Sequence, residues 1–236
     1  MIDLDKLFNR YKLSLNEQEE ITKYIYDIYI HPKFQERLSD SFLRHDKISL
    51  GEHILEDTIV TYLLIKGKKV EVDIDIALKI AMFHDLYTLP WQNNSLNDAT
   101  KFTNKHGFRH PIEAIINAIN WFPEHFNDLD KAYMIIDGVV HHMYPLPVGN
   151  LYTRDENNLE LQNYDLLQNI NDALFDLIVK SCNRGYLNSV SFASSQFMEG
   201  KLMSKADKKV SLNNFKNTSI KSKLALLTGI NKSLEK

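Results

Sequence analysis

Apolar side chains recur at helical spacing along most of this chain. In segment 16–30 they fall on one helical face: Ile21, Tyr24, Ile25, Ile28 and Tyr29. The same kind of pattern predicts further helices over residues 32–43, 49–67, 72–86, 111–122, 129–142, 161–186 and 191–213. Prolines lie at or near several of these boundaries, where they start or stop a helix: Pro32, Pro90, Pro111 and Pro145. The pattern predicts an all-α protein whose helices pack as a bundle.

One segment carries a different pattern. Residues 70–76 (VEVDIDI) alternate apolar and acidic side chains, which is typical of a strand. The segment is short, has no obvious partner strand and continues into an apolar helix. We therefore favour a helix here, and a strand is the alternative.

Composition supports the helical interpretation. The 236 residues include 8 Gly and 6 Pro, about half of what an average usage of roughly 12% would supply. A shortage of turn formers argues against an all-β protein, and 44% hydrophobic residues argue against a disordered chain. We expect a single domain over residues 1–236.

Charge and cysteine content narrow the class further. The formal net charge of −3 does not favour nucleic acid as a partner. No run of 18 apolar residues occurs, and the acidic start MIDLD lacks the pattern of a signal peptide, so we expect a cytoplasmic protein without a membrane span. The single cysteine, Cys182, rules out an intramolecular disulfide and a thiolate zinc site.

Histidines near the ends of successive helices are the strongest chemical signal. His84 and Asp85 end the most apolar helix, His53 and His142 lie on other predicted helices, and His110 lies at the start of one, next to Pro111. A lone histidine is more often a core or surface residue than a ligand. Several of them around one apolar bundle favour a metal site between facing helices. Nitrogen and oxygen ligands without thiolate suit Mn, Fe, Co, Ni, Zn or Mg.

Five short segments occur in a characteristic order: HDKISLGEH (45–53), FHDLY (83–87), HGFRHP (106–111), HMYPL (142–146) and ADK (206–208). This order resembles the HD superfamily of metal-dependent phosphohydrolases, and more closely the bacterial HD-domain hydrolases of unassigned substrate. Two positions of the first segment depart from the family pattern, Asp46 and Gly51, and neither is a ligand position. The resemblance implies an HD-type helical bundle with a core at about 30–215.

The resemblance also implies a ligand set for one or two divalent transition metal ions. The first ion would be held by His53, His84, Asp85 and Asp207. The carboxylate of Asp85 would bridge to a second ion bound by His110 and His142. For His141 two interpretations stay open, a further ligand or a residue that supports a ligand.

The long interval before segment 206–208 is unusual for the family. It implies an inserted helical segment in the C-terminal half, at about 148–200. It also creates a competitor for the last ligand, because in residues 177–184 Asn183 stands where an aspartate would be expected. We favour Asp207, because residues 203–211 match the family pattern over more positions.

The activity that the resemblance implies is hydrolysis of a phosphate mono- or diester by a metal-activated water. The substrate would be a small phosphorylated metabolite or a nucleotide. Asp85 would act at the metals, His106 would orient the substrate or act as a general acid, and Arg109 would neutralise phosphoryl charge. Further candidate substrate contacts are Lys208, Tyr87, Trp91 and Tyr144. A solvated arginine and packed aromatic rings are the ordinary alternatives.

Two other functions compete with a hydrolase. Part of the superfamily uses a di-iron centre for oxygenase chemistry with the same ligand types, and a non-catalytic module could bind a nucleotide in the same pocket. A plain helical interaction protein would require the five ordered segments to be a coincidence. The remaining segment, 216–236, predicts a basic amphipathic helix. A solvated helical face is its ordinary role, and contact with RNA, a membrane surface or a partner helix is the alternative.

Overall fold

The computed structural model describes residues 4–39, 41–45, 48–67, 71–88, 106–149, 152–155, 158–161, 167, 170–187 and 190–217. Over these residues the protein is mostly helical, which confirms the all-α class. The helices are α1 (Leu4–Tyr11), α2 (Leu15–Ile30), α3 (Pro32–Arg37), α4 (Leu50–Lys66), α5 (Ile74–Phe83), α6 (His106–Trp121), α7 (Leu129–Val140), α8 (Asp172–Cys182) and α9 (Met198–Asn217). A short 3-10 helix, η4 (Pro123–Phe126), joins α6 to α7.

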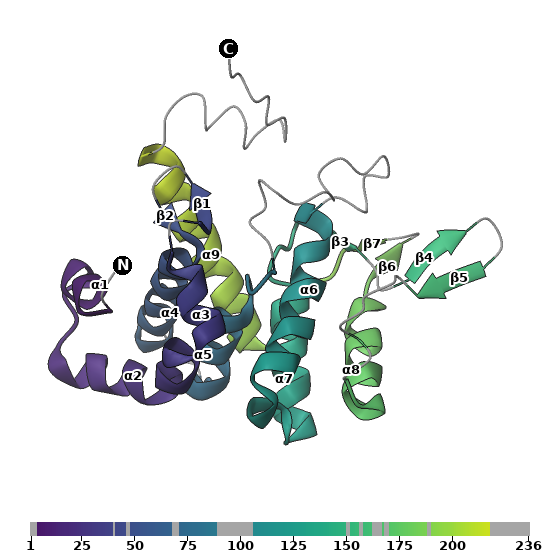
Figure 1. Ribbon diagram of the computed structural model, residues 1–236, viewed down its shortest axis with the longest axis horizontal. Helices are drawn as coiled ribbons and strands as arrows, with labels where there is room; N and C mark the ends of the chain where they lie inside the picture. Colours follow the sequence, from purple (N-terminus) through teal and green to yellow (C-terminus); the bar gives the residue numbers. More distant parts are fainter. Residues whose placement is uncertain are drawn as a thin grey trace, which may run out of the picture.

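The centre of the fold is formed by α4, α5, α7 and α9. The late helix α9 packs against all three of the others, so it lies beside helices from the first half of the chain (Figure 1). Helix α2 packs on α5, and α8 packs on α7. Segments far apart in the sequence therefore meet in one bundle, which is where the candidate ligands converge.

Capping residues explain where the two helices that carry the first histidines begin. The Ser49 side chain accepts a hydrogen bond from the backbone N–H of Glu52, and this cap begins α4 where the helix over 49–67 was predicted to begin. Asp73 caps α5 by accepting from the N–H of Ile76. Because this cap begins a helix at Ile74, the strand alternative for residues 70–76 is wrong over its described part.

Glycine permits the close approach of α5, α7 and α9. A Cβ added to Gly138 would lie 2.5 Å from Cδ1 of Ile80, and one added to Gly200 would lie 2.8 Å from the Cα of Gly138. A larger residue at Gly138 would force α7 away from α5 or displace the Ile80 side chain. This contact brings together the helices that carry or precede most of the candidate ligands.

The C-terminal half is less helical than predicted. Where an inserted helical segment was expected, at 148–200, the described residues form α8, the start of α9 and short strands: β3 (Val148–Gly149), β4 (Tyr152–Asp155), β5 (Asn158–Leu161), β6 (Tyr186–Leu187) and β7 (Val190–Ser191). All of their pairings are antiparallel. Asn171 caps α8, so the helix starts later than residue 161. Gly185, at φ 62°, permits the turn that leads into β6.

Other boundaries differ by smaller amounts. The helix expected at 32–43 ends at Arg37, and a short pair of strands follows, β1 (Leu43–His45) and β2 (Ile48–Ser49). Pro111 lies inside α6 rather than at its start. Most of the basic helix expected over 216–236 falls outside the described residues.

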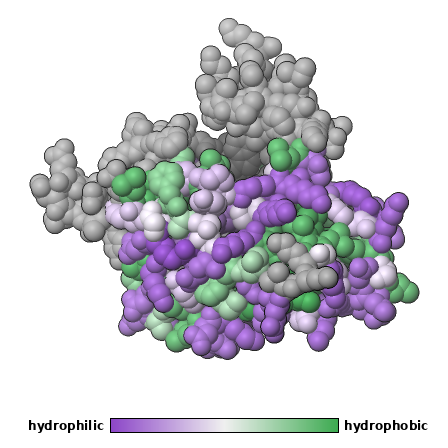
Figure 2. Space-filling model, turned by 180° about the vertical axis from the view of Figure 1, so that it is seen from behind, coloured by the Kyte–Doolittle hydropathy of each residue, from purple (hydrophilic) through white to green (hydrophobic). Residues whose placement is uncertain are grey.

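The surface is mixed in character. Figure 2 shows hydrophilic side chains over much of one face, with hydrophobic ones gathered in smaller areas between them. Among the described residues, no helix combines the length and apolar character needed to cross a membrane.

Candidate metal centre

The candidate ligands come from five places in the bundle. Helix α4 contributes His53 and Asp57, which are one turn apart. The others are His84 and Asp85 directly after α5, His110 on α6, His142 just beyond α7, and Asp207 on α9. All seven side chains are buried. They form two groups, each of which can hold a metal ion.

The first group contains His53, Asp57, His84 and Asp207. Oδ2 of Asp57 lies 2.9 Å from Nε2 of His53 and 3.2 Å from Nε2 of His84. Oδ1 of Asp207 lies 3.4 Å from Nε2 of His53. Two imidazole nitrogens and two carboxylates therefore converge on one small volume.

The second group contains Asp85, His110 and His142. Oδ1 of Asp85 lies 3.3 Å from Nε2 of His110 and 3.8 Å from Nε2 of His142. The two histidine Nε2 atoms are 3.1 Å apart. This group is smaller and offers three ligand atoms.

Asp85 connects the two groups. While Oδ1 faces the second group, Oδ2 lies 3.5 Å from Nε2 of His84 and 3.8 Å from Nε2 of His53. Its two oxygens thus face different sets of imidazoles. This is the arrangement required of a carboxylate that bridges two cations.

Backbone carbonyls orient three of the histidine rings. Nδ1 of His84 lies 2.7 Å from the carbonyl oxygen of Ala81, and Nδ1 of His142 lies 2.8 Å from that of Val139. Nδ1 of His110 lies 3.2 Å from the carbonyl oxygen of His106, one turn earlier. A neutral ring that donates from Nδ1 presents a lone pair at Nε2, and this is how ligating histidines are held.

The turn that carries His84 and Asp85 is fixed from outside the site. Nη2 of Arg37 donates to the carbonyl oxygen of Tyr87 at 3.0 Å, and Nδ2 of Asn117 donates to that of Leu86 at 2.6 Å. The Arg37 guanidinium is itself buried, between the rings of Phe42 and Trp121. Side chains from α3 and α6 therefore hold the backbone just after the two ligands.

A cation fits the chemistry of the first group. The Asp57 carboxylate is fully buried: its Oδ2 faces Nε2 of His53 and of His84, and among the described residues its Oδ1 has no hydrogen-bond partner. Burying an ionised carboxylate is costly unless its charge is compensated, and a divalent ion between these atoms would compensate it.

The acidic residues also shift the pKa values of the histidines. Burial of His84 favours its neutral form, but the carboxylates of Asp85 and Asp57 outweigh burial and raise its pKa to about 9. Burial, together with the nearby His84 ring, lowers the pKa of His142 to about 4. The buried carboxylates therefore favour positive charge at His84 more than at His142.

His141 does not join either group. Its Nε2 lies 3.0 Å from the carbonyl oxygen of Ser181 and 3.9 Å from Oδ1 of Asp137. The chain leaves α7 at this point, so the adjacent side chains of His141 and His142 point to different sides. The structure does not support a ligand role for His141, because its ring faces α8.

The competition for the last carboxylate is clear in the structure. Asp207 is buried and belongs to the first group. Asn183 is exposed at the C-terminal cap of α8. The residue favoured from sequence is the one that reaches the site.

The candidate substrate residues differ in how exposed their side chains are. His106 is buried and stacks on His110 with ring centroids 5.3 Å apart, and the edge of Tyr87 packs on His106 at 4.7 Å. Tyr87 is buried as well, so both rings support His110 as packed neighbours. Tyr144 is 43% exposed.

The two candidate cations are half-buried. Arg109 lies on α6, one residue before the ligand His110. Nζ of Lys208 donates to the carbonyl oxygen of Ser204 at 3.1 Å, within its own helix. Trp91 lies outside the described residues.

Sequence reasoning missed Asp57. Its signal was present, because an aspartate four positions after His53 lies on the same helical face one turn later. The neighbouring acids of α4 are used differently, since Glu52 and Glu56 both pair with Arg10 of α1. Helix α4 therefore carries two glutamates that pair with Arg10, and a His53–Asp57 pair that faces the candidate metal centre.

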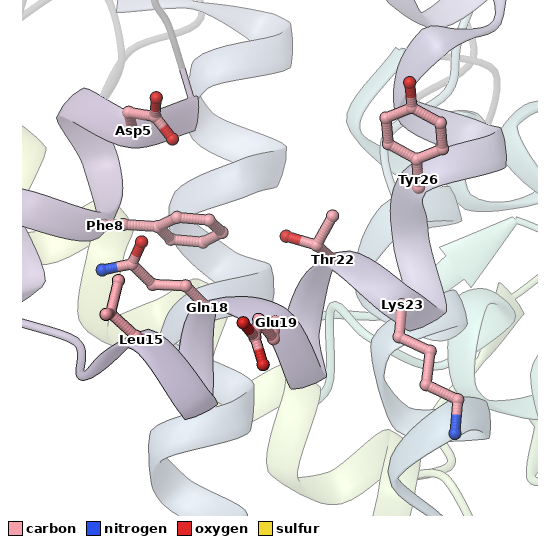
Figure 3. A pocket seen from close by; sticks show the side chains of 8 residues that line it. All are labelled: Asp5, Phe8, Leu15, Gln18, Glu19, Thr22, Lys23 and Tyr26. Atoms are coloured by element: carbon pink, nitrogen blue, oxygen red, sulfur yellow. The ribbon is translucent and has the colours of Figure 1, made fainter.

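The cavity shown in Figure 3 is separate from this centre. It has a volume of about 660 Å³, is lined by residues of α1 and α2, and contains none of the candidate ligands. Comparisons with family models, with curated proteins and with solved structures gave no match.

Proposed function

We propose that this protein is a metal-dependent phosphohydrolase of the HD type, acting on a phosphate mono- or diester of a small metabolite or nucleotide. The observation that carries the proposal is Asp85, whose two carboxylate oxygens face two separate groups of imidazoles. The ordered sequence segments that resemble the HD superfamily lead to the same residues.

The ligand sets follow from the two groups. His53, Asp57, His84 and Asp207 would hold one divalent ion, His110 and His142 would hold the other, and Asp85 would contact both. Nitrogen and oxygen donors suit Mn, Fe, Co, Ni, Zn or Mg. When bound, such ions lower the pKa of a coordinated water and neutralise charge on phosphoryl oxygens.

The chain's own residues supply orientation and charge. The carbonyls of Ala81 and Val139 hold the imidazoles of His84 and His142 with Nε2 inward. In this proposal the guanidinium of Arg109 pairs with two phosphate oxygens, because it lies next to His110 and has the planar geometry for bidentate contact. Lys208 adds positive charge beside Asp207.

The test begins with metal content. Elemental analysis of the purified chain should find one or two transition ions per chain, and His84→Ala should reduce that number. A panel of phosphomonoesters, phosphodiesters and nucleotides is then assayed with added Mn²⁺ or Ni²⁺. Turnover of a phosphate ester that Asp85→Ala abolishes would support the proposal. If the protein contains iron, takes up oxygen and turns over no ester, the result would contradict the hydrolase proposal and favour the oxygenase alternative.

A further inference from the structure

A third group of candidate ligands lies where α2 meets η4. It consists of Asp27, Glu124 and His125, with one ligand atom from each residue within 4.8 Å of the others. Nε2 of His125 lies 2.9 Å from Oδ2 of Asp27 and 3.8 Å from Oε1 of Glu124. The group shares no residue with the candidate metal centre.

The His125 ring is largely buried and lies against aromatic side chains. Its side chain is only 9% exposed, and among the described residues its buried Nε2 has no partner in hydrogen-bond geometry. Phe83 and Phe122 flank the ring, with centroids 5.8 and 6.4 Å from it. The imidazole is thus held in place with its nitrogen directed at two carboxylates.

The two carboxylates are partly exposed, so they can bind a cation while the rest of each side chain stays in contact with water. The side chains of Asp27 and Glu124 are 54% and 58% exposed. Two further charged groups that act on His125 are Asp75 and Lys79, which pair with each other at 2.8 Å. Among these four groups the balance is negative, and Asp27 and Glu124 produce the surplus.

We propose that Asp27, Glu124 and His125 bind a divalent transition ion at the surface, and that this ion ties α2 to η4. One imidazole and two carboxylates are an ordinary ligand set for Zn²⁺ and its neighbours, with water completing the coordination. The site is separate from the proposed hydrolase, and its occupancy does not depend on the buried centre.

Calorimetric titration of the chelator-stripped full chain with Zn²⁺ tests this proposal. We expect a binding event that the double variant Asp27→Asn/Glu124→Gln weakens at least tenfold. The matched control is Glu71→Gln/Asp176→Asn, which removes two exposed acids elsewhere and should leave that event unchanged. The event should also persist in Asp85→Asn, so a failure here is distinguishable from a failure of the proposed function.

A second measurement observes the ligand directly. In ¹⁵N NMR of the histidine rings, Zn²⁺ should shift the Nε2 signal of His125, which is assigned by its absence in His125→Gln. Equal Zn²⁺ affinity in the wild type and in Asp27→Asn/Glu124→Gln would overturn the proposal. An unshifted His125 signal at saturating Zn²⁺ would overturn it as well.

Discussion

The Nε2 atoms of His110 and His142 lie 3.1 Å apart, although both rings direct Nδ1 at a backbone carbonyl. When both rings are neutral and donate from Nδ1, two lone pairs face each other across this gap. The contact becomes favourable when one ring is protonated or when a cation lies between the nitrogens. Burial lowers the pKa of His142 to about 4, so this ring is neutral near neutral pH and does not itself supply the positive charge.

This relationship predicts which ion each variant loses. His142→Ala should remove the second ion and leave the first, whereas His84→Ala should remove the first. Asp85→Ala should lower the affinity for both, because its oxygens face both groups. Elemental analysis after gel filtration measures the stoichiometry. Equal metal content in Asp85→Ala and wild type would contradict the bridging role.

Replacing His141 should have a different effect from replacing His142. In His141→Gln the metal content should be unchanged, because the ring contacts the Ser181 carbonyl instead of a ligand group. Its stability should fall by about 1–3 kcal/mol, since a buried hydrogen bond is disturbed. Urea unfolding and elemental analysis of His141→Gln and His142→Ala distinguish a structural residue from a metal ligand. Metal loss in His141→Gln would restore the ligand interpretation.

Asp57→Asn tests the residue that sequence reasoning missed. The change keeps the shape of the side chain but removes the charge that faces His53 and His84. Metal affinity at the first site should fall by at least about 10- to 100-fold, the range found when residues that support a metal's ligands are replaced. Competition with a chelator of known affinity measures the change. Unaltered affinity would place Asp57 outside the coordination.

A pair of glycine variants tests the packing of α5 against α7. Gly138→Ala should destabilise the protein by about 1–3 kcal/mol, because its Cβ would lie 2.5 Å from Ile80. Gly107→Ala is the matched control, since a Cβ there meets nothing within 4 Å. It should be neutral or stabilising by up to about 1 kcal/mol. Urea denaturation of both variants gives the comparison.

Glu20 should contribute a pH-dependent share of stability. Hydrogen bonds from Lys66 and Tyr62 lower the pKa of Glu20 below its ordinary 4.5. The contribution is therefore present above about pH 4.5 and is lost as the pH falls through the lowered value. Because both charged side chains are partly exposed, it should be at most about 1 kcal/mol.

The measurement is urea unfolding in the presence of chelator at pH 7 and pH 3.5. The stability difference between wild type and Glu20→Gln should shrink at the lower pH. Lys66→Met should lose about as much stability at pH 7 as Glu20→Gln does. The double variant Glu20→Gln/Lys66→Met should lose little more than either single variant. A difference that does not change with pH would contradict the assignment.

Helix positions were predictable because they depend on local signals. Ser49 begins α4 through its own side chain, and the apolar run before His84 could pack in a helix without further information. The short strands between residues 148 and 191 were missed, because strands of two to four residues leave no measurable periodicity. There the apolar pattern was assigned to helices that in fact begin later.

The site was predictable as a set of residue types but not as a set of directions. The sequence predicts six ligands, and the structure places their side chains in two neighbouring groups: His53, His84, Asp85, His110, His142 and Asp207. His141 and His142 are neighbours of the same type, and only the path of the chain beyond α7 decides which one faces the site. Asp57 can be recognised as a ligand only when two facts are combined: it lies one turn after His53 on α4, and it faces His84, which directly follows α5.

Helix α9 gives the proposed centre a particular order of assembly. Asp207 lies on the last described helix, whereas its partner His53 lies on α4, in the first third of the chain. During synthesis, His53, Asp57 and His84 are all present long before the carboxylate of Asp207 exists. A nascent chain would therefore hold an incomplete first site, and full metal affinity would appear only when α9 docks on α4 and α5. Metal binding would then report that the whole chain, rather than its first half, has reached its folded state.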